Sequence, residues 1–493
     1  MDVLINVAPA ELVGVGGIDD GRHFPAGNVV LEQVEARGKR VRLWERWGWR
    51  KRAGNGNKYV TGPVMGSLGP AMGRYSAGEL EACRGHRPVW LCNLRQRGAV
   101  CEGMMHNLSQ LFAPLLVAPL LLAPGPVPLK PAPAAALPAT NAAESNLSKI
   151  KLPKGFRISY FAQNVPGARA LAVGADGTVY VGTKDAGAKG KVYALPDKNH
   201  DGKADGVFTV AAGLNSPNGV AMRQGSLYVA EINRIIRFDN VAANLKMPPK
   251  PVVVYDRLPD NPWHGMRYIG FGPDGLLYVP VGAPCNSCEP AKPVFGTINR
   301  MRPDGTGFQN IATGVRNTVG FDWHPKTKEL WFTDNGRDLL GDNLPPDELN
   351  RLTKLGQHFG FPYFFAGDVP DPELSAGKTA AMYTKPARKL GAHVASLGMK
   401  FYTGTTFPAQ YRNQIFIPEH GSWNRSKKSG YRISLVRLDA TGQQATSYET
   451  FAEGWLQGQE SWGRPVCLLV LADGSLLVSD DEGGVVFRIW YAG

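Results

Sequence analysis

The chain contains few cysteines, six among 493 residues, and only two of them are spaced for local chemistry. Cys285 and Cys288 form a C-x-x-C within APCNSCEP, directly after an expected strand end. A zinc site would need a second pair, and only Cys467 remains in this part of the chain, inside an apolar stretch. No helix start follows the pair, which disfavours a thioredoxin-type motif. We therefore predict a disulfide between Cys285 and Cys288 that stiffens a loop.

Apolar runs long enough to span a bilayer are lacking as well. The run at 111–123 has about 13 residues, against the ~20 that a membrane-spanning helix needs. It follows Met104 and Met105 and precedes Pro- and Ala-rich sequence with Ala-x-Ala sites. This pattern predicts a secretory signal peptide over 104–139 and a linker over 140–149. We therefore expect a periplasmic or secreted protein that has no stable membrane span after export.

The first 103 residues lack any sustained helical or strand period. They include the basic, Trp-rich run RVRLWERWGWRKR at 40–52. Export signals are read at the N-terminus. A signal peptide that begins about a hundred residues into the chain therefore predicts that translation starts at Met104 or Met105. Residues 1–103 would then be a non-native extension from a mis-assigned start; the alternative is a real, disordered basic segment.

Positive charge exceeds negative charge but is not concentrated. The formal net charge is +13, yet the Lys and Arg residues are scattered and no known nucleic-acid motif is present. We therefore expect no nucleic-acid partner. A basic balance suits equally well a protein that binds an acidic small molecule.

One sequence pattern is repeated six times in the last two-thirds of the chain: an apolar strand, a tight turn with Gly or Asp, and a second apolar strand. The repeats lie at 171–182, 220–231, 269–282, 319–336, 397–421 and 466–484. Units at intervals of roughly 50 residues, each too small to bury its own face, form a radial or stacked array. Short antiparallel strands in such an array predict an all-β fold, a six-bladed β-propeller of four-stranded antiparallel blades.

This propeller is expected to occupy residues 150–493. The strand within KLPKGFRISYFAQNV (151–165) should close the ring against the last strand, VVFRIWY at 485–491. The longest interval between repeats, from about 338 to 396, is expected to form inserted loops and short helices over one face.

A calcium-type loop is present in DKNHDGKADG at 197–206. Its candidate ligands are Asp197, Asn199, Asp201 and Asp205. Their spacing, with Gly202 at the turn, can wrap oxygens around one hard cation. The acidic residue expected at the twelfth position is replaced by Phe208. The alternative interpretation is a polar turn between strands.

Polar residues also stand at the edges of the predicted blade strands. They are Asn218, His264, Arg316, Asn317, Gly336, Arg337, His420, Arg425 and Arg464. Strand edges of successive blades converge on one axial cleft, where ligands of propellers bind. One general base among several guanidiniums suits an anionic ligand that undergoes redox or acyl chemistry. For any single residue, such as His264, the alternative is a capping or surface role.

Six motifs keep the order found in one known family: WHGMRYIGFGPDG, GAPCNSCEP, GVRNTVGFDWHP, FTDNGRD…DELN, HFGFPY and EHGSWNRS…GYRI. Together they resemble the sorbosone dehydrogenase family of pyrroloquinoline quinone (PQQ)-dependent sugar dehydrogenases, which are related to the soluble periplasmic aldose dehydrogenases. The resemblance covers roughly 150–493 and leaves 1–103 outside.

The resemblance implies that His264 is the general base, taking a proton from a sugar hydroxyl while hydride passes to the quinone. It implies that Arg316 and Asn317 contact the quinone oxygens and the substrate, although Thr318 stands where the family has Pro. It also implies a Ca²⁺ ion that bridges the cofactor to backbone carbonyls at Gly336 and at Arg337, which replaces a Pro.

Further residues follow from the same resemblance. Asp347 and Glu348 match a pair that braces a structural calcium ion. The cofactor's carboxylates would be held by Arg464 and, as a looser match, by Arg425. Trp462 replaces a second Arg and could stack on the quinone. We place Asn218 among the cofactor-binding residues as well.

The predicted function is oxidation of an aldose or a sorbosone-like sugar aldehyde to the lactone or acid, dependent on PQQ and calcium. The chain lacks a C-x-x-C-H haem motif, so a separate electron acceptor, a cytochrome or a quinone, is expected. Two alternatives remain. One is a metal-dependent propeller lactonase that uses Asn218, Asp334 and Glu231. The other is a non-catalytic binding propeller.

Overall fold

The computed structural model describes residues 146–493 throughout, and four short strands of the preceding part. In that part β1 (Val3–Asn6) pairs with β4 (Met72–Tyr75), and β2 (Glu45–Ala53) pairs with β3 (Gly56–Val64). The chain divides into two compact units, 1–129 and 130–493, and each is described by itself. The predicted signal peptide at 104–139 lies outside the described residues, as does most of the predicted extension.

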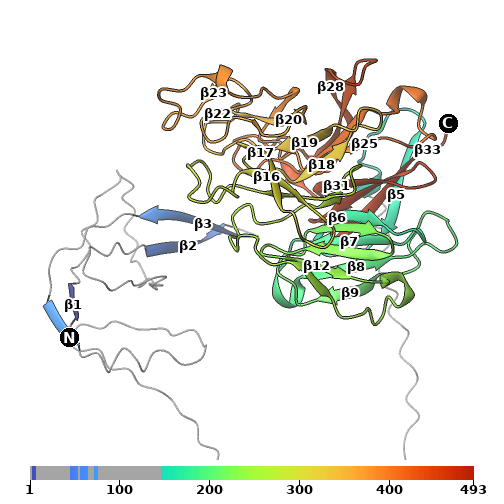
Figure 1. The fold of residues 1–493 in the computed structure, drawn as a ribbon, viewed down its shortest axis with the longest axis horizontal. Coiled ribbons are helices and arrows are strands. Elements are labelled where there is room, and N and C mark those ends of the chain that lie inside the picture. Colours follow the sequence, from blue (N-terminus) through green and yellow to red (C-terminus); the bar gives the residue numbers. More distant parts are fainter. Residues whose placement is uncertain (1–2, 7–44, 54–55, 65–71, 76–145) are drawn as a thin grey trace, which may run out of the picture. The chain divides into compact units, whose positions relative to one another are not determined.

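Six small antiparallel sheets make up residues 156–491. The first three follow one another along the chain (Figure 1). Blade 1 comprises β6 (Ala168–Val173), β7 (Val179–Thr183), β8 (Lys191–Leu195) and β9 (Phe208–Ala212). Blade 2 comprises β10 (Gly219–Arg223), β11 (Ser226–Ala230), β12 (Ile235–Phe238) and β13 (Val252–Tyr255). Blade 3 comprises β14 (Gly270–Phe271), β15 (Leu277–Val281), β16 (Thr297–Met301) and β17 (Gln309–Thr313).

The remaining three sheets complete the ring. Blade 4 comprises β18 (Gly320–Trp323), β19 (Leu330–Asp334), β20 (Pro346–Leu352) and β24 (Arg388–Ala392). Blade 5 comprises β25 (Lys400–Phe401), β26 (Ile415–Glu419), β27 (Arg432–Leu438) and β28 (Ala445–Glu453). Blade 6 comprises β31 (Pro465–Val470), β32 (Leu476–Asp480), β33 (Val485–Tyr491) and β5 (Phe156–Ala162). The prediction of a six-bladed propeller is confirmed, and each repeat of the sequence pattern supplies the two inner strands of one blade.

The tight turns explain why the repeated sequence pattern forms hairpins. In blade 1 the Asp176 carboxylate accepts hydrogen bonds from the backbone N–H of Thr178 at 3.2 Å and from its hydroxyl at 2.8 Å. Gly177, at φ +82°, supplies the left-handed conformation that this turn requires. The turn therefore sets the pairing of β6 with β7.

The hydrophobic core lies between blades rather than inside any one of them. One cluster of buried side chains combines Tyr180 and Val192 of blade 1 with Val220 and Val229 of blade 2. Similar clusters join the other neighbouring blades. Strands such as β7, which are buried along their full length, therefore depend on both neighbouring blades.

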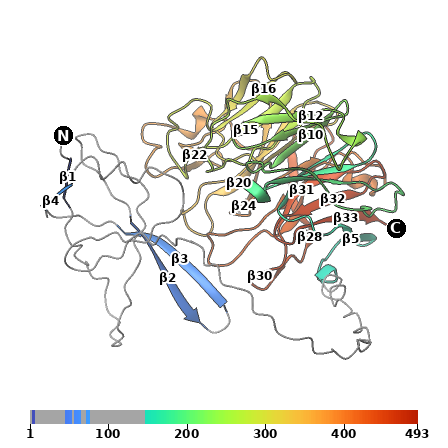
Figure 2. The ribbon, with the colours of Figure 1, turned by 90° about the horizontal axis from the view of Figure 1, so that it is seen from below.

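The ring is closed by strands from the two ends of the propeller. β33, near the C-terminus, pairs antiparallel with β5, with Phe487 opposite Tyr160. The two strands lie side by side in both ribbon views (Figures 1 and 2). The predicted closure is therefore confirmed: the third and fourth strands of blade 6 come from opposite ends of the propeller and pair with each other.

The expectation for 338–396 was incomplete. Besides loops, this interval supplies the blade strands β20 and β24, and β21 (Gln357–His358) pairs in parallel with β17. β22 (Phe364–Phe365) and β23 (Val369–Pro370) form a small hairpin. Its helical content among the described residues is one 3₁₀ turn, η3 (Ala380–Met382). β20 was missed because its buried residues include Asp347, Glu348 and Asn350, so no apolar pattern marks it.

The other elements are short connections. Three further 3₁₀ turns are η1 (Gly187–Lys189), η2 (Val241–Ala243) and η4 (Ala409–Tyr411). A hairpin of β29 (Leu456–Gln457) and β30 (Glu460–Ser461) precedes blade 6. Across the described residues, no helix has both the length and the apolar character needed to cross a bilayer.

Replacing Phe487 tests the ring closure. Its fully buried ring packs against Tyr160 on β5 and against Trp455. We expect Phe487→Ala to lower the free energy of unfolding by about 3–5 kcal/mol, because it leaves a cavity at the closing seam. Denaturant titration of the full chain measures this. Val252→Ala is the control, since Val252 is 45% exposed. A loss below about 1 kcal/mol for Phe487→Ala would show that the seam bears little of the stability.

Candidate functional site

The two inner strands of each blade bring their polar flanking residues to the same end of the propeller. Because the strands are antiparallel, the start of the first lies beside the end of the second, as in the pairs Gly219 with Ala230 and Gly320 with Thr333. We call this the site end. Residues that precede the first strand or follow the second strand of any blade therefore gather here around the axis.

Hydrogen bonds connect blades 5, 6, 1 and 2 at the site end. Arg464 Nε donates to the carbonyl of His420 at 2.9 Å, and His420 Nε2 is 2.7 Å from Asp481 Oδ1. Arg169 donates to the other oxygen of Asp481 at 3.1 Å and to Asn218 Oδ1 at 2.8 Å. These contacts run across the seam between blades 6 and 1.

The chain of contacts continues through blades 2, 3 and 4. Asn218 Nδ2 donates to the carbonyl of Arg267 at 2.8 Å, and Arg267 Nη1 donates to the carbonyl of His264 at 3.2 Å. His264 Nδ1 lies 2.9 Å from the carbonyl of Ala283. The N–H of Ala283 in turn donates to the carbonyl of Arg316 at 2.8 Å.

Blades 4 and 5 complete the circuit. Arg316 Nη1 donates to the carbonyl of Asn335 at 3.3 Å, and Asn335 Nδ2 donates to the carbonyl of Ser396 at 2.6 Å. The adjacent Ala395 accepts from the N–H of His420 at 2.9 Å. We call this circuit of hydrogen bonds the axial ring. It brings His264, Arg316, Asn218 and Arg464 together at one end.

His264 has the features of a proton acceptor. A carbonyl can only accept, so Nδ1 carries the hydrogen and Nε2 keeps its lone pair in the neutral ring. Burial, aided by the nearby Arg316 charge, lowers the pKa of His264 to about 3, so the ring is neutral near pH 7. Its backbone is left-handed (φ +49°) and crosses Gly282 so closely that a Cβ on Gly282 would meet His264 Cβ at 2.6 Å.

A second histidine stands on the same ring. His420 was noted at a strand edge in the sequence, but its partner Asp481, after β32, was not identified. Burial lowers the pKa of His420 to about 4, and hydrogen bonding to His420 holds the pKa of Asp481 well below its usual range. The pair resembles the His–carboxylate arrangement of many general bases. The run SDDEG, with two carboxylates at a strand end, was the available signal.

Arg316 is buried, and most of its N–H groups donate hydrogen bonds to other residues of the protein. Its guanidinium donates to the backbone and side-chain oxygens of Asn286, to Asn335 and to Asp338. These four contacts leave one of its five N–H groups for a ligand. Burial lowers the pKa of Arg316. The N–H of Asn317 donates to Asp334 at 2.6 Å, whereas its side-chain amide has no hydrogen-bond partner in the described residues.

Arg464 and Arg425 are cations without a carboxylate partner in the described part of the chain. Arg464 donates to the carbonyls of His420 and Gly421 and lies over the Tyr431 ring. Arg425 donates only to neutral oxygens, those of Lys427, Ala392 and Asn343. Neither forms an ion pair in the described residues, although the Arg425 charge contributes to a lowered pKa of the nearby Asp342. Half-buried cations without a paired carboxylate fit a ligand with several carboxylates, so the residues present fit PQQ.

Arg267 was missed by the sequence analysis. It is 1% exposed and donates to the carbonyls of Ile232, Pro259 and His264 at 3.0–3.2 Å. Burial lowers its pKa to about 10. The guanidinium therefore holds the loop that carries His264. A buried Arg three residues after the histidine gives no sequence signal, because charged residues are ordinarily exposed.

Two residues predicted to contact the cofactor, Trp462 and Asn218, use their polar groups in hydrogen bonds within the protein. Trp462 donates its indole N–H to the carbonyl of Gly454 at 2.8 Å and packs near Trp455 and Phe487 in the core of blade 6. This placement does not favour stacking on a quinone. Both ends of the Asn218 amide are used by Arg169 and Arg267, so this residue braces the axial ring.

The predicted calcium ligands at the site end have free carbonyls. Gly336 and Arg337 are partly exposed, and their carbonyls accept no hydrogen bond from the described residues. The N–H of Gly336 donates to Asp347 at 3.0 Å. Backbone oxygens of this kind are suitable Ca²⁺ ligands. The residues therefore fit the predicted ion.

Buried carboxylates lie beside these carbonyls. Asp334 on β19 faces Glu348 on β20, and Asp347 is adjacent. Burial raises the pKa of Asp347 to about 6. Burial also raises the pKa values of Asp334 and Glu348, and the neighbouring Asp334 charge contributes to the rise at Glu348. The described residues contain no set of three or more His, Cys, Asp or Glu grouped as a metal site.

The loop at 197–206 lies at the opposite end of blade 1, because it follows the third strand. Its oxygens bond to backbone N–H groups of the loop itself: Asp197 to Gly202 at 3.0 Å and Asp205 to Lys198 at 2.8 Å. Asn199 and Asp201 also bond to each other. These contacts are those of a polar turn, and calcium binding here stays a prediction.

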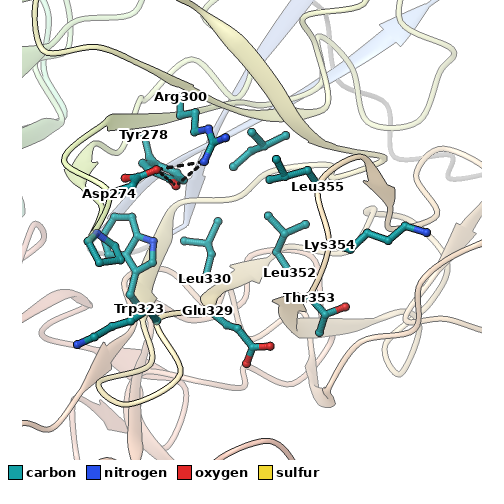
Figure 3. Close-up of a pocket in the computed structure, with 13 residues that line it drawn as sticks. Asp274, Tyr278, Arg300, Trp323, Glu329, Leu330, Leu352, Thr353, Lys354 and Leu355 are labelled. Atoms are coloured by element: carbon teal, nitrogen blue, oxygen red, sulfur yellow. Dashed lines mark hydrogen bonds and ion pairs between the residues drawn. The ribbon is translucent and has the colours of Figure 1, made fainter.

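A pocket of about 390 Å³ also lies away from the site end. It opens between the turns of blades 3 and 4, where Asp274, Tyr278 and Arg300 bond to one another (Figure 3). Trp323 and Leu355 are among its other lining residues. None of the predicted site residues lines it.

The predicted disulfide between Cys285 and Cys288 is confirmed. Its loop follows β15 at the site end and carries Asn286, the residue that holds Arg316. In the sequence the C-x-x-C spacing marks the disulfide and a strand edge marks Arg316, but no pattern connects Asn286 with Arg316.

Comparison with known proteins places the chain in a family. The family model for a domain of unknown function, DUF7133, matches residues 142–486. The chain belongs to this family. A protein of Borreliella burgdorferi described as uncharacterised is 35% identical over 374 residues, which span 71% of this chain and 93% of that protein. The DUF7133 region contains every predicted site residue.

A shorter match carries a functional name. A PQQ-dependent pyranose dehydrogenase of Coprinopsis cinerea is 32% identical over 127 residues, 21% of this chain and 16% of that protein. The matched stretch is thus a small part of that enzyme.

Solved structures show the same fold as this DUF7133 chain. The holo form of the PQQ domain of the Coprinopsis cinerea pyranose dehydrogenase superposes with a TM-score of 0.59 at 19% identity, covering 69% of this chain and 97% of that chain. A calcium structure of a Trichoderma reesei enzyme of carbohydrate-active family AA12 gives 0.60 at 21%, with the same coverage. At these identities the likeness concerns the fold.

The buried carboxylates predict a pH dependence of stability. Their pKa values in the folded state are raised above the unfolded values near 4. The folded state therefore binds more protons, and calcium-free protein should lose stability as pH rises from about 4 through the folded-state pKa values, by up to ~1.4 kcal/mol per pH unit for each group. Denaturant titrations at several pH values measure this.

Glu348→Gln should flatten the profile, because it removes one of the buried charges. The control is Glu449→Gln, whose side chain is 44% exposed. Stability that rises over the same pH range would contradict the assignment.

Proposed function

We propose that this protein is a PQQ-dependent sugar dehydrogenase that uses calcium. The proposal is carried by the arrangement of the axial ring, in which a neutral His264 with an open Nε2 shares the site end with arginines that lack carboxylate partners. The names of the C. cinerea relative and of the solved structures support a sugar oxidoreductase on this fold.

In this proposal the sugar's anomeric hydroxyl, or that of a hydrated aldehyde, gives its proton to His264 Nε2. Ala283 keeps the ring in the required tautomer, and Arg267 holds the loop in place. The remaining N–H of Arg316 and the free amide of Asn317 would orient an oxygen of substrate or cofactor. Loss of the hydroxyl proton to His264, and of a hydride to the two-electron acceptor from the carbon that bears this hydroxyl, gives the lactone or acid.

The cofactors would be held by residues already described. Arg464 and Arg425 would pair with PQQ carboxylates, and the carbonyls of Gly336 and Arg337 would bind Ca²⁺. Bound PQQ supplies the two-electron acceptor, polarised by the ion. We propose in addition that Asp347 and Glu348 brace a calcium ion, and that the loop at 197–205 holds another.

The finer assignments are proposals of the same kind. A sorbosone-like aldehyde or an aldose is the substrate that the sequence motifs favour, and a separate cytochrome or quinone would take the electrons. Export to the periplasm or beyond the cell would follow from the signal peptide predicted at 104–139, and it agrees with the disulfide.

The lactonase alternative is less well supported. Its three candidate ligands are bound by the protein itself: Asn218 by Arg169, Asp334 by the N–H groups of Arg316 and Asn317, and Glu231 by Arg234 and Asn215. A non-catalytic propeller would not require the unpartnered arginines and an open neutral histidine together.

Dye reduction by the full chain tests the function. We expect activity on aldoses or sugar aldehydes that requires both added PQQ and calcium, and a loss of roughly 100-fold or more in kcat for His264→Ala. His420→Ala is measured in parallel, because His420 is the other neutral histidine of the axial ring. A greater loss in His420→Ala would move the base there. Gln410→Ala, exposed in the turn η4 at the other end of the propeller, is the control for either substitution.

No quinone binding, together with hydrolysis of lactones, would replace the dehydrogenase with the lactonase.

Arg464→Met tests the cofactor cradle. We expect PQQ affinity to fall by roughly tenfold or more, because a charge-assisted hydrogen bond to a carboxylate is lost. Absorbance titration of PQQ into the calcium-loaded protein measures it. The control is Arg223→Met, whose guanidinium lies over Phe271 near a turn at the other end. Unchanged PQQ affinity would remove Arg464 from the cradle.

A further inference from the structure

Of the two residues enclosed by the disulfide, one bonds to the candidate site rather than to its own blade. Asn286 lies between Cys285 and Cys288. Its backbone carbonyl accepts from Arg316 Nε at 2.8 Å, and its side-chain Oδ1 accepts from Arg316 Nη2 at 2.8 Å. One edge of the guanidinium thus donates hydrogen bonds to two oxygens of a single residue.

The same residue also holds the loop after β19. Asn286 Oδ1 accepts from the N–H of Asp338 at 2.8 Å, and its Nδ2 donates to the carbonyl of Asp338 at 3.1 Å. The Asp338 carboxylate then pairs with Arg316 Nη2 at 3.0 Å. Asn286, Arg316 and Asp338 form a closed triangle in which each contacts the other two. Removal of one member leaves the others with unsatisfied partners.

Two contacts fasten the disulfide loop to the inserted segment. Ser287 Oγ donates to Asp371 at 2.6 Å, and Asp371 also pairs with Arg337 at 2.5 Å. Tyr363 donates its hydroxyl to Glu289 at 2.8 Å. These contacts hold the outside of the loop, whereas Asn286 alone of this loop reaches Arg316 in the described residues.

We propose that Asn286, held in its conformation by the Cys285–Cys288 disulfide, is the positioning residue that aims the Arg316 guanidinium. The proposal rests on the proposed function in one respect, that Arg316 contacts substrate or cofactor. Arg316 enters the site from blade 4, but its direction is set by a cross-linked loop of blade 3.

The physical reason is the number of free rotations. An arginine side chain has considerable rotamer freedom, and hydrogen bonds to its planar guanidinium fix the directions in which its N–H groups point. Three of the four contacts of Arg316 involve Asn286 or Asp338. The one remaining N–H therefore points where this pair directs it. Opening the disulfide would let the loop backbone adopt more conformations. The hydrogen bonds among Asn286, Arg316 and Asp338 would then have to hold Asn286 in place without the cross-link.

Enzyme kinetics provide the first test. With the sugar that gives activity, Asn286→Ala should lower kcat/KM by roughly 10- to 100-fold, because hydrogen bonds to a charged group are lost. Asn286→Asp should recover part of this, since a carboxylate still accepts from Arg316 and from the N–H of Asp338 but cannot donate to the carbonyl of Asp338. The matched control is Ser287→Ala, in the same loop, which loses only the bond to Asp371 and should stay within about twofold.

The coupling between the disulfide and Asn286 gives the second test. Cys285→Ser with Cys288→Ser, or mild reduction of the full chain, should lower kcat/KM in the native background. The same change should add little to Asn286→Ala, because both act through one group. Fully additive losses would overturn the proposal and leave the disulfide a purely structural cross-link.

A third measurement needs neither cofactor nor substrate. In ¹⁵N-labelled protein the Arg316 Nε–H signal, assigned by its disappearance in Arg316→Lys, should exchange slowly with solvent. Exchange should be faster by roughly tenfold or more in the reduced protein and in Asn286→Ala, in which the carbonyl that accepts from Nε–H is kept but is no longer held by the side-chain bonds to Asp338. It should not change in Ser287→Ala. Unchanged exchange in both the reduced protein and Asn286→Ala would overturn the proposal even if no sugar is oxidised, so its failure is separate from failure of the proposed function.

Discussion

The axial ring is the constraint on which the rest of the structure depends. The apolar side chains between blades hold neighbouring blades together, but the hydrophobic effect is non-directional. Hydrogen bonds are directional, so they restrict the angle between neighbouring blades as well. At the site end each blade contributes at least one polar group that bonds across to the next, from Arg464 through Asn218 and His264 to Asn335. The geometry of the site and the angular spacing of the blades are therefore set by the same contacts.

Charge at this end is distributed unevenly, and the imbalance has a chemical meaning. Carboxylates such as Asp347 and Glu348 are buried in one part of the site, while Arg464 and Arg425 are left without carboxylate partners in another. Each group is costly alone in a partly dry environment. A cation beside the carboxylates and an anion beside the arginines would relieve both costs, which is why the site suits a metal ion and an acidic cofactor bound together.

Local sequence patterns were sufficient for the elements whose apolar residues and turns repeat. The inner hairpins and the disulfide could be predicted because each depends on residues close together in sequence. The closure by β5 and β33 could be predicted because a ring of repeats must join its two ends. β20 could not, since its buried side chains are polar and gain their partners from other blades. For the same reason His264 was found by its motif, but Arg267 and Asn286, which hold the site residues from a distance, were not. Long-range contacts leave no local pattern.

Closure of the ring by β5 and β33 has a consequence for the order of assembly. The first strand of the propeller to be synthesised pairs with the last, more than 300 residues later, so blade 6 cannot form until the whole domain has left the ribosome. Such non-local pairing slows folding. Until then β5 is an unpaired edge with apolar residues such as Phe161, open to pairing with other chains. If the chain is exported as proposed, crossing the membrane unfolded would postpone this step until both ends have arrived on the same side.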